Sequence, residues 1–102
     1  MNDNETAKIL KSLGDPTRLR IFEMLRGGTK CACVLLKEFE ISQPTLSYHM
    51  KYLLASGIVT CEKSGKWCNY SVDEKRFSEL LNYLSSPVIE AKTEICQCHE
   101  KE

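Results

Sequence analysis

Apolar residues in the first half of the chain recur three or four positions apart, the spacing that places side chains on one face of a helix. This pattern predicts helices over residues 5–13, from Asp15-Pro16 to Gly27, over 31–38, and from Ser42 to Gly57. The predicted inward positions are Ile9, Leu10 and Leu13; Leu19, Phe22 and Leu25; Val34 and Leu35; and Leu46, Met50, Leu53 and Leu54.

The predicted helix ends rest on residues with known terminal preferences. Asp15 and Ser42 have side-chain oxygens that cap free amides at a helix start, and Pro16 suits the first turn. Three residues, 40–42, connect the third and fourth predicted helices. Such a short connection is typical of a helix-turn-helix.

After residue 57 the hydrophobic period changes from helical spacing to alternation. The segment IVTCEKSGKWCNYSV, with Ser64-Gly65 at its centre, predicts a two-stranded hairpin. Residues 74–97 return to helical spacing, and Ser86-Pro87 is expected to kink or split that helix. The apolar seam of this last helix consists of Phe77, Leu81, Leu84, Val88, Ala91 and Ile95.

The order of elements predicts a winged helix-turn-helix, a mainly α fold with a β-hairpin wing (α-α-α-α-β-β-α). With 102 residues, the chain is expected to form a single DNA-binding domain over 1–102. If the apolar stripe of the fourth helix faces inward, its polar face carries hydroxyls, an amide and a cation, which can meet base edges and phosphates.

The candidate DNA-contacting residues lie on the fourth helix and at the hairpin tip: Gln43, Pro44, Thr45, Ser47, Tyr48, Lys51, Lys63 and Lys66. The helix start near Gln43 can also direct amide hydrogens at a phosphate. The alternative interpretation is a solvated polar face next to an ordinary turn.

The charge distribution qualifies the prediction of DNA binding. Fourteen basic residues balance fourteen acidic ones, and a net charge of zero argues mildly against binding a polyanion. The charges are uneven, however. Residues 41–72 carry three lysines and one glutamate, so three minus one leaves +2, and the chain beyond Phe77 is acidic.

The six cysteines are the other chemical signal. No apolar window is long enough to cross a membrane, and the polar, acidic N-terminus is unlike a secretory signal, so we expect a cytoplasmic protein. In that compartment cysteines serve as metal ligands or redox groups more often than as disulfides. Cys61 and Cys68 are expected to face each other across a two-residue turn, as small buried residues or as a redox-sensitive pair.

The segments LGDPTRLRIFEML, KCACVLLKEF, SQPTLSYHMKYL and SGKWCNYSV resemble the ArsR/SmtB family of metalloid- and metal-responsive repressors, from about Ile9 to Leu84. The resemblance implies a homodimer formed by the first and last helices, here residues 1–13 and 74–98. It also implies that the fourth helix binds double-stranded operator DNA until a ligand lowers its affinity. The seam of the last helix independently indicates helix pairing, although an intramolecular core is the alternative.

In arsenical repressors of this family, the helix before the DNA-reading helix carries a Cys-x-Cys motif that binds trivalent arsenic or antimony. Cys31 and Cys33 occupy these positions, so the resemblance implies arsenite or antimonite as inducer and no permanent cofactor. Soft thiolates suit such ions. Positions i and i+2 lie ~200° apart on a regular helix, so we expect the first turn to unwind on binding.

The sequence departs from the family pattern at the third sulfur ligand. Some members have a third cysteine where this chain has Leu36, so Cys96 and Cys98 are candidate additional ligands, from either subunit. That pair alternatively binds a second ion or is incidental. Cadmium and lead sensors use N-terminal cysteines, which residues 1–30 lack, and zinc sensors use Asp and His of the last helix, which here has only His99.

Two other classes of function are alternatives to metalloid sensing. The same fold can respond to another thiophilic ion (Cd, Pb, Zn or Cu) or to a redox or sulfide signal through its cysteines. An enzyme is not expected. A thiol-disulfide enzyme favours Cys-x-x-Cys, which is absent, and two histidines offer little for a hydrolytic nucleophile and base.

Overall fold

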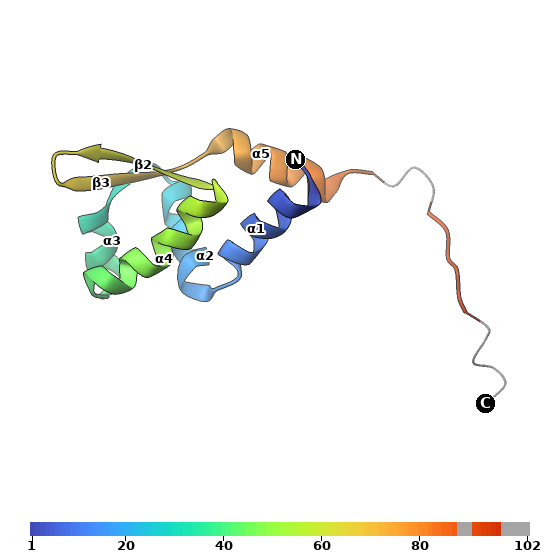
Figure 1. Ribbon diagram of the computed structural model, residues 1–102, viewed down its shortest axis with the longest axis horizontal. Helices are drawn as coiled ribbons and strands as arrows, with labels where there is room; N and C mark the ends of the chain where they lie inside the picture. The colour runs from blue at the N-terminus through green and yellow to red at the C-terminus, as the bar shows by residue number, and fades with distance from the viewer. Residues whose placement is uncertain (88–90, 97–102) are drawn as a thin grey trace, which may run out of the picture.

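The computed structural model describes residues 1–87 and 91–96, which form five helices and three strands (Figure 1). The helices are α1 (Asp3–Leu13), α2 (Pro16–Arg26), α3 (Ala32–Phe39), α4 (Gln43–Ser56) and α5 (Glu74–Ser85). The strands are β1 (Lys30–Cys31), β2 (Val59–Ser64) and β3 (Trp67–Val72). The predicted winged helix-turn-helix is confirmed, with β1 as an element that the sequence pattern did not predict.

Side-chain caps explain where α1, α2, α4 and α5 begin. α1 begins at Asp3, earlier than predicted, because Asn2 Oδ1 accepts from the Glu5 amide (2.8 Å) while Glu5 Oε1 accepts from the Asn2 amide (3.0 Å). Asp15 caps α2 and Ser42 caps α4, as predicted, and Asp73 caps α5. Caps of this kind each stabilise a helix by about 1 kcal/mol.

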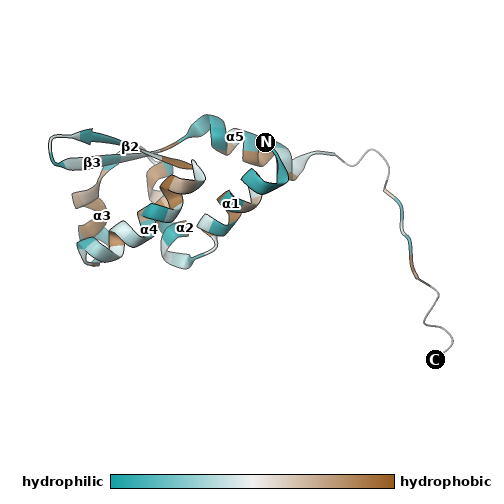
Figure 2. Cartoon of the chain, viewed as in Figure 1, coloured by the Kyte–Doolittle hydropathy of each residue, from teal (hydrophilic) through white to brown (hydrophobic). Residues whose placement is uncertain are grey.

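The core lies where the helices meet the inner face of the hairpin. Fourteen apolar residues are buried there: Ile9, Ile21, Phe22, Leu25, Ala32, Leu35, Leu46, Met50, Leu53, Ile58, Val59, Tyr70, Val72 and Leu80. In Figure 2 the hydrophobic positions of α3 and α4 contrast with the hydrophilic far end of the hairpin. Leu46, Met50 and Leu53 fix the rotation of α4, so its opposite face is exposed to solvent.

Three residues predicted to face inward are instead substantially exposed. Leu10, Leu19 and Val34 are 43%, 44% and 43% accessible, whereas Ile21 is fully buried. Spacing alone cannot distinguish a face built on residues 19, 22 and 25 from one built on 21, 22 and 25. The elements packed against α2, which include α1, α4 and β3, decide between them.

The sheet ties the start of α3 to the wing. Its strand order is β1-β3-β2, and both pairings are antiparallel. Lys30 pairs with Tyr70 and Cys31 with Asn69, so Cys31 is extended (φ −69°, ψ 148°) and lies outside α3. The third helix therefore spans residues 32–39, not 31–38, because pairing with β3 holds Cys31 in a strand.

The wing turn lies one residue later than predicted. Ser64 pairs with Trp67, so the two turn residues are Gly65 and Lys66, and Gly65 has a positive φ of 64°. This register places Cys61 opposite Tyr70 and Cys68 opposite Lys63, so the two cysteines are diagonal neighbours. The expected burial is wrong for Cys61, which is exposed, while Cys68 is half-buried.

The last helix is shorter than predicted. α5 ends at Ser85, residues 86–87 and 91–96 are not helical, and 88–90 and 97–98 lie outside the described residues. Pro87 explains the end, because a proline pushes the preceding residue into an extended conformation, and Ser86 has ψ 129°. Within the segment 74–98 that is expected to mediate dimerisation, the helix covers Glu74–Ser85, and Ile95 is 77% exposed and outside any helix.

No helix in the described ranges, 1–87 and 91–96, combines the length and the apolar content needed to span a membrane.

Candidate nucleic-acid interface and thiol site

One polar surface combines the exposed face of α4 with the tip of the wing. All eight residues that the sequence singled out are exposed: Gln43, Pro44, Thr45, Ser47, Tyr48, Lys51, Lys63 and Lys66. The first six lie on α4, Lys63 lies near the end of β2, and Lys66 lies in the wing turn. A helix with a free polar face beside a basic hairpin has the shape and charge to enter a DNA groove and contact the flanking backbone.

Aromatic and cation–π contacts join side chains in the middle of the α4 face. The rings of Tyr48 and Tyr52 meet edge to face at 5.3 Å, and the Arg18 guanidinium lies 4.7 Å from the Tyr52 ring centroid. A hydrogen bond with Tyr52 raises the pKa of Tyr48. Arg18 is itself held by its Nε, which donates to the Ser12 carbonyl at 2.6 Å. These contacts place the Tyr48 side chain and the Arg18 guanidinium on either side of the Tyr52 ring.

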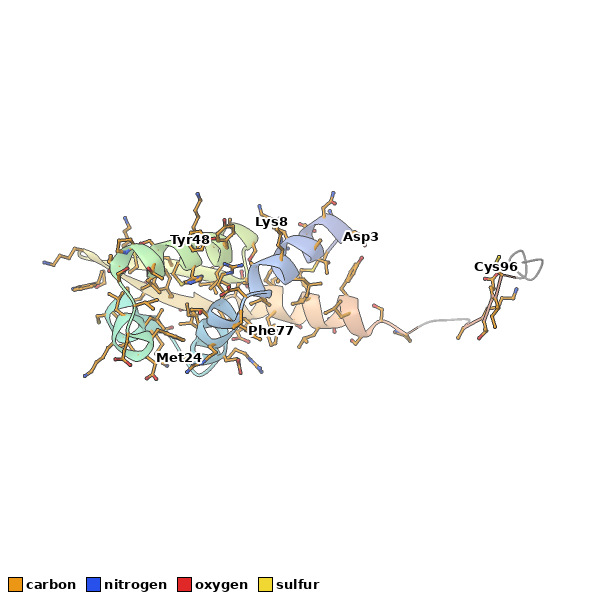
Figure 3. All side chains as sticks on the ribbon, turned by 90° about the horizontal axis from the view of Figure 1, so that it is seen from below. Asp3, Lys8, Met24, Tyr48, Phe77 and Cys96 are labelled. Carbon is orange, nitrogen blue, oxygen red and sulfur yellow. The ribbon has the colours of Figure 1, made fainter. Side chains whose placement is uncertain are left out.

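Two lysines of α1 extend this surface and were not identified from the sequence. Lys8 and Lys11 line a groove of about 220 Å³ with Tyr52 and Ala55 of α4. Figure 3 shows Lys8 and Tyr48 along the same edge of the molecule. Both lysines lie on the polar side of α1, but only the packing of α1 against α4 places that side beside the exposed face of α4.

The thiols of Cys31 and Cys33 converge at the start of α3. Cys33 Sγ donates to Cys31 Sγ, and the two sulfurs are 2.9 Å apart. The premise that both cysteines lie on a regular helix, on which the expected unwinding rests, is wrong. Cys31 is the N-cap residue, and its extended backbone directs the side chain over the first turn, where Cys33 lies.

The two thiols of this pair differ in acidity. The Cys33 thiol donates to Cys31, and the nearby amides of Cys33 and Val34 add a smaller contribution, so the pKa of Cys31 is lowered. The same hydrogen bond raises the pKa of Cys33. Positive potential at a helix N-terminus favours a thiolate in this position. The pair therefore consists of a thiolate-prone acceptor and a thiol donor, with Cys33 exposed and Cys31 half-buried.

The thiol pair is connected to both the wing and α4. Cys31 pairs with Asn69 of β3, which is the inner strand of the wing. Cys33 lies in α3, which packs against α4 across the turn of residues 40–42. The two cysteines are therefore linked to the wing by strand pairing and to α4 through the packing of α3.

Comparison with known proteins identifies the family. Residues 15–60 match the family described as "Bacterial regulatory protein, arsR family". The arsenical resistance operon repressor of Staphylococcus xylosus is 40% identical over 100 residues, covering 96% of this chain and 92% of that protein. The chain belongs to the arsR family. The repressor of the same name from Staphylococcus aureus is 38% identical over 98 residues, with the same coverage of both chains.

Solved structures agree with the arsR-family fold. A possible transcriptional regulator for arsenical resistance superposes with a TM-score of 0.69 and 28% identity, covering 78% of this chain and 82% of that one. The repressor BigR from Xylella fastidiosa gives a TM-score of 0.64 at 31% identity, covering 83% and 90%. As an arsR-family member, the protein is a DNA-binding transcriptional regulator and not an enzyme.

α3 does not supply a third sulfur ligand beside Cys31 and Cys33. Leu36, which stands where some arsR-family members have a third cysteine, is half-buried and packs against the core. In the described ranges, 1–87 and 91–96, no three His, Cys, Asp or Glu side chains gather to hold an ion. Figure 3 places Cys96 away from the folded body, and Cys98 lies outside the described residues.

The difference in acidity within the pair predicts an order of alkylation. We expect iodoacetamide to modify Cys31 before Cys33 from about pH 6 to about pH 8, although Cys33 is the more exposed thiol, because a lowered pKa keeps the thiolate populated at lower pH. In Cys33→Ala the donor is removed, so the pKa of Cys31 rises and its rate at neutral pH falls several-fold. Peptide mass spectrometry over a pH series measures both rates; faster labelling of Cys33 contradicts the assignment.

Proposed function

We propose that the protein is a cytoplasmic, metalloid-responsive repressor. It binds operator DNA as a homodimer and releases it when trivalent arsenic or antimony is captured by Cys31 and Cys33. The observation that carries the proposal is the convergence of these two thiols, 2.9 Å apart, at a point joined to both the wing and α4. The names of the Staphylococcus relatives support the same class of inducer.

In this proposal the α4 face reads the major groove. Gln43, Thr45 and Ser47 lie on the first two turns, where an amide and two hydroxyls reach base edges, and the helix start accepts a phosphate. Tyr48 and Lys51 follow on the same exposed face. Lys63 and Lys66 reach the neighbouring backbone or minor groove from the wing.

The dimer is proposed to form through α1 and α5. These helices are joined within one chain by the Arg76 Nη2 to Glu5 Oε2 ion pair at 3.3 Å, and they lie side by side in Figure 1. Leu81 and Leu84 of α5 are 50% and 56% exposed although they are large and apolar. A second copy of the chain provides the surface that buries them.

Capture of arsenic is a condensation that needs no oxidant. Arsenous acid, As(OH)3, reacts with two thiols to give a dithiolate, (RS)2AsOH, and two molecules of water. Because the arsenic atom lies between the two sulfurs, they must separate from the 2.9 Å of the hydrogen-bonded pair. Part of the binding free energy therefore shifts Cys31, which pairs with β3 and caps α3. Movement of Cys31 then changes the positions of the wing and α4 relative to the DNA.

A titration of the DNA complex tests the function. A duplex obtained by in vitro selection is bound to the reduced protein, and arsenite, antimonite, cadmium or zinc is added in a mobility-shift assay. We expect arsenite and antimonite to release the DNA. Release by peroxide or persulfide, with arsenite inert, would instead assign the pair to redox sensing, for which its low-pKa thiolate beside a second cysteine is suited.

The wing contributes a separate prediction. We expect Lys63→Ala/Lys66→Ala to weaken binding to all duplexes alike and to reduce the slope of log K against log salt by about 0.9 for each phosphate that the lysines neutralise. The reason is that neutralising a phosphate releases counterions without reading sequence. Fluorescence anisotropy at several salt concentrations measures the slope. The control Lys75→Ala/Lys92→Ala removes two exposed lysines elsewhere; an equal change in slope there counts against a specific role of the wing.

A further inference from the structure

Cys61 and Cys68 form a second thiol pair for which the proposed function has no use. They lie on β2 and β3, on the same face of the wing, in diagonal register. Cys61 is exposed and Cys68 half-buried, so packing of small apolar side chains does not account for Cys61. Partial desolvation, and then the nearby Cys68, raise the pKa of Cys61.

One member of the pair, Cys68, borders a hollow between the wing and the starts of α3 and α4. Cys68 lines a cavity of about 290 Å³ together with Tyr70, Trp67, Lys66, Gln43 and Ala32. Burial, and then the nearby Cys68, raise the pKa of Tyr70 to about 12, so its hydroxyl stays protonated and can donate to a ligand oxygen. The cavity thus offers a thiol, a hydroxyl donor and a cation around open space.

The register distinguishes two products that a thiol pair can form. A disulfide needs Cβ atoms roughly 3.5–4.5 Å apart, whereas diagonal cross-strand neighbours have Cα atoms roughly 7–8 Å apart and Cβ atoms only somewhat closer. A direct sulfur–sulfur bond would therefore distort the wing. An atom inserted between the sulfurs lengthens the bridge and suits the diagonal arrangement.

We infer that Cys61 and Cys68 form a second binding site, which takes trivalent arsenicals that exchange two oxygen ligands for two sulfurs. The reaction is R–As(OH)2 + 2 R′SH → R–As(SR′)2 + 2 H2O. Arsenic stays trivalent, no electrons are transferred, and both thiol protons leave in water. A raised thiol pKa therefore does not oppose the reaction. The third substituent on arsenic, hydroxyl or organic, occupies the cavity beside Tyr70.

This inference goes beyond the proposed function and does not depend on it. The wing pair can bind an arsenical whether or not Cys31 and Cys33 trigger release of DNA. Binding to the pure protein is therefore measured without DNA, in a variant that lacks the other four cysteines.

The test uses the full chain with Cys31, Cys33, Cys96 and Cys98 replaced by serine, reduced with a phosphine. Phenylarsenous acid is added, and native mass spectrometry counts the adducts. We expect one arsenical per chain with loss of two waters, together with a change in fluorescence of Trp67, the single tryptophan, which precedes Cys68. In the same background, Cys61→Ser or Cys68→Ser should weaken binding at least about 100-fold, because the second bond is no longer intramolecular.

Two results overturn the inference. One is the absence of an adduct in the four-serine variant when its circular dichroism matches wild type. The other is an adduct that survives removal of either thiol. If the four-serine variant does not fold, the count is made on wild type and on Cys61→Ser/Cys68→Ser, which should bind one arsenical fewer per chain. An equal number of arsenicals in the two proteins contradicts the inference. So does a pair that loses two hydrogens on treatment with peroxide, as in disulfide formation, but forms no arsenical adduct.

Discussion

The Cys31→Ser/Cys33→Ser variant is expected to hold operator DNA at arsenite concentrations at least about 100-fold above those that release wild type, because serine oxygens replace both chelating sulfurs. Its affinity for DNA without arsenite should stay within about twofold of wild type, since neither side chain lies on the exposed face of α4 or at the wing tip. Mobility-shift titration under reducing conditions measures both quantities.

The matched control removes the same number of thiols from the wing. Cys61→Ser/Cys68→Ser should release DNA at wild-type arsenite concentrations, because these residues are not part of the α3 site. Normal release from the Cys31→Ser/Cys33→Ser variant contradicts the site assignment. Cys96→Ser/Cys98→Ser tests the additional ligands: a partial loss of sensitivity identifies a third sulfur from that segment, and no loss shows that two sulfurs suffice.

Charge placed on the exposed leucines of α5 should separate the proposed dimer. We expect Leu81→Glu/Leu84→Glu to be monomeric at micromolar concentration and to bind operator DNA at least about 100-fold more weakly, because two linked recognition helices bind two half-sites cooperatively. Sedimentation equilibrium measures the mass, and anisotropy measures DNA affinity. Both leucines are at least half exposed in one chain, so the fold of the monomer should be retained.

Asn82→Glu provides the control for this variant. Asn82 is exposed on the same helix but on a different side from Leu84. Its substitution by glutamate adds a negative charge to α5, as each leucine substitution does. We expect this protein to remain dimeric with wild-type DNA affinity. A Leu81→Glu/Leu84→Glu protein that stays dimeric places the interface elsewhere. Unfolding of that variant, seen by circular dichroism, would show that the two leucines stabilise the monomer itself.

Local signals in the sequence were sufficient for most of the fold. Helix starts at Asp15 and Ser42 were predictable because a cap and the amides that it accepts from lie within three residues of each other. The polar face of α4 was predictable because three buried residues at helical spacing, Leu46, Met50 and Leu53, leave a single orientation for the helix. The end of α5 was only partly predictable from the sequence. Pro87 predicts an interruption of the helix, but it does not determine whether a helix resumes after it.

The amino-acid sequence by itself determined the order of the elements, the solvent-exposed side of α4 and the presence of a Cys-x-Cys pair, because each depends on residues close together along the chain. Only the tertiary structure decided how the two sulfurs meet. Pairing of Cys31 with Asn69, 38 positions later, removes Cys31 from the helix and brings the thiols to 2.9 Å. The tertiary structure also decided the register of the wing and the placement of Lys8 beside Tyr52. Contacts between distant segments depend on how whole elements pack, which periodicity along the chain does not encode.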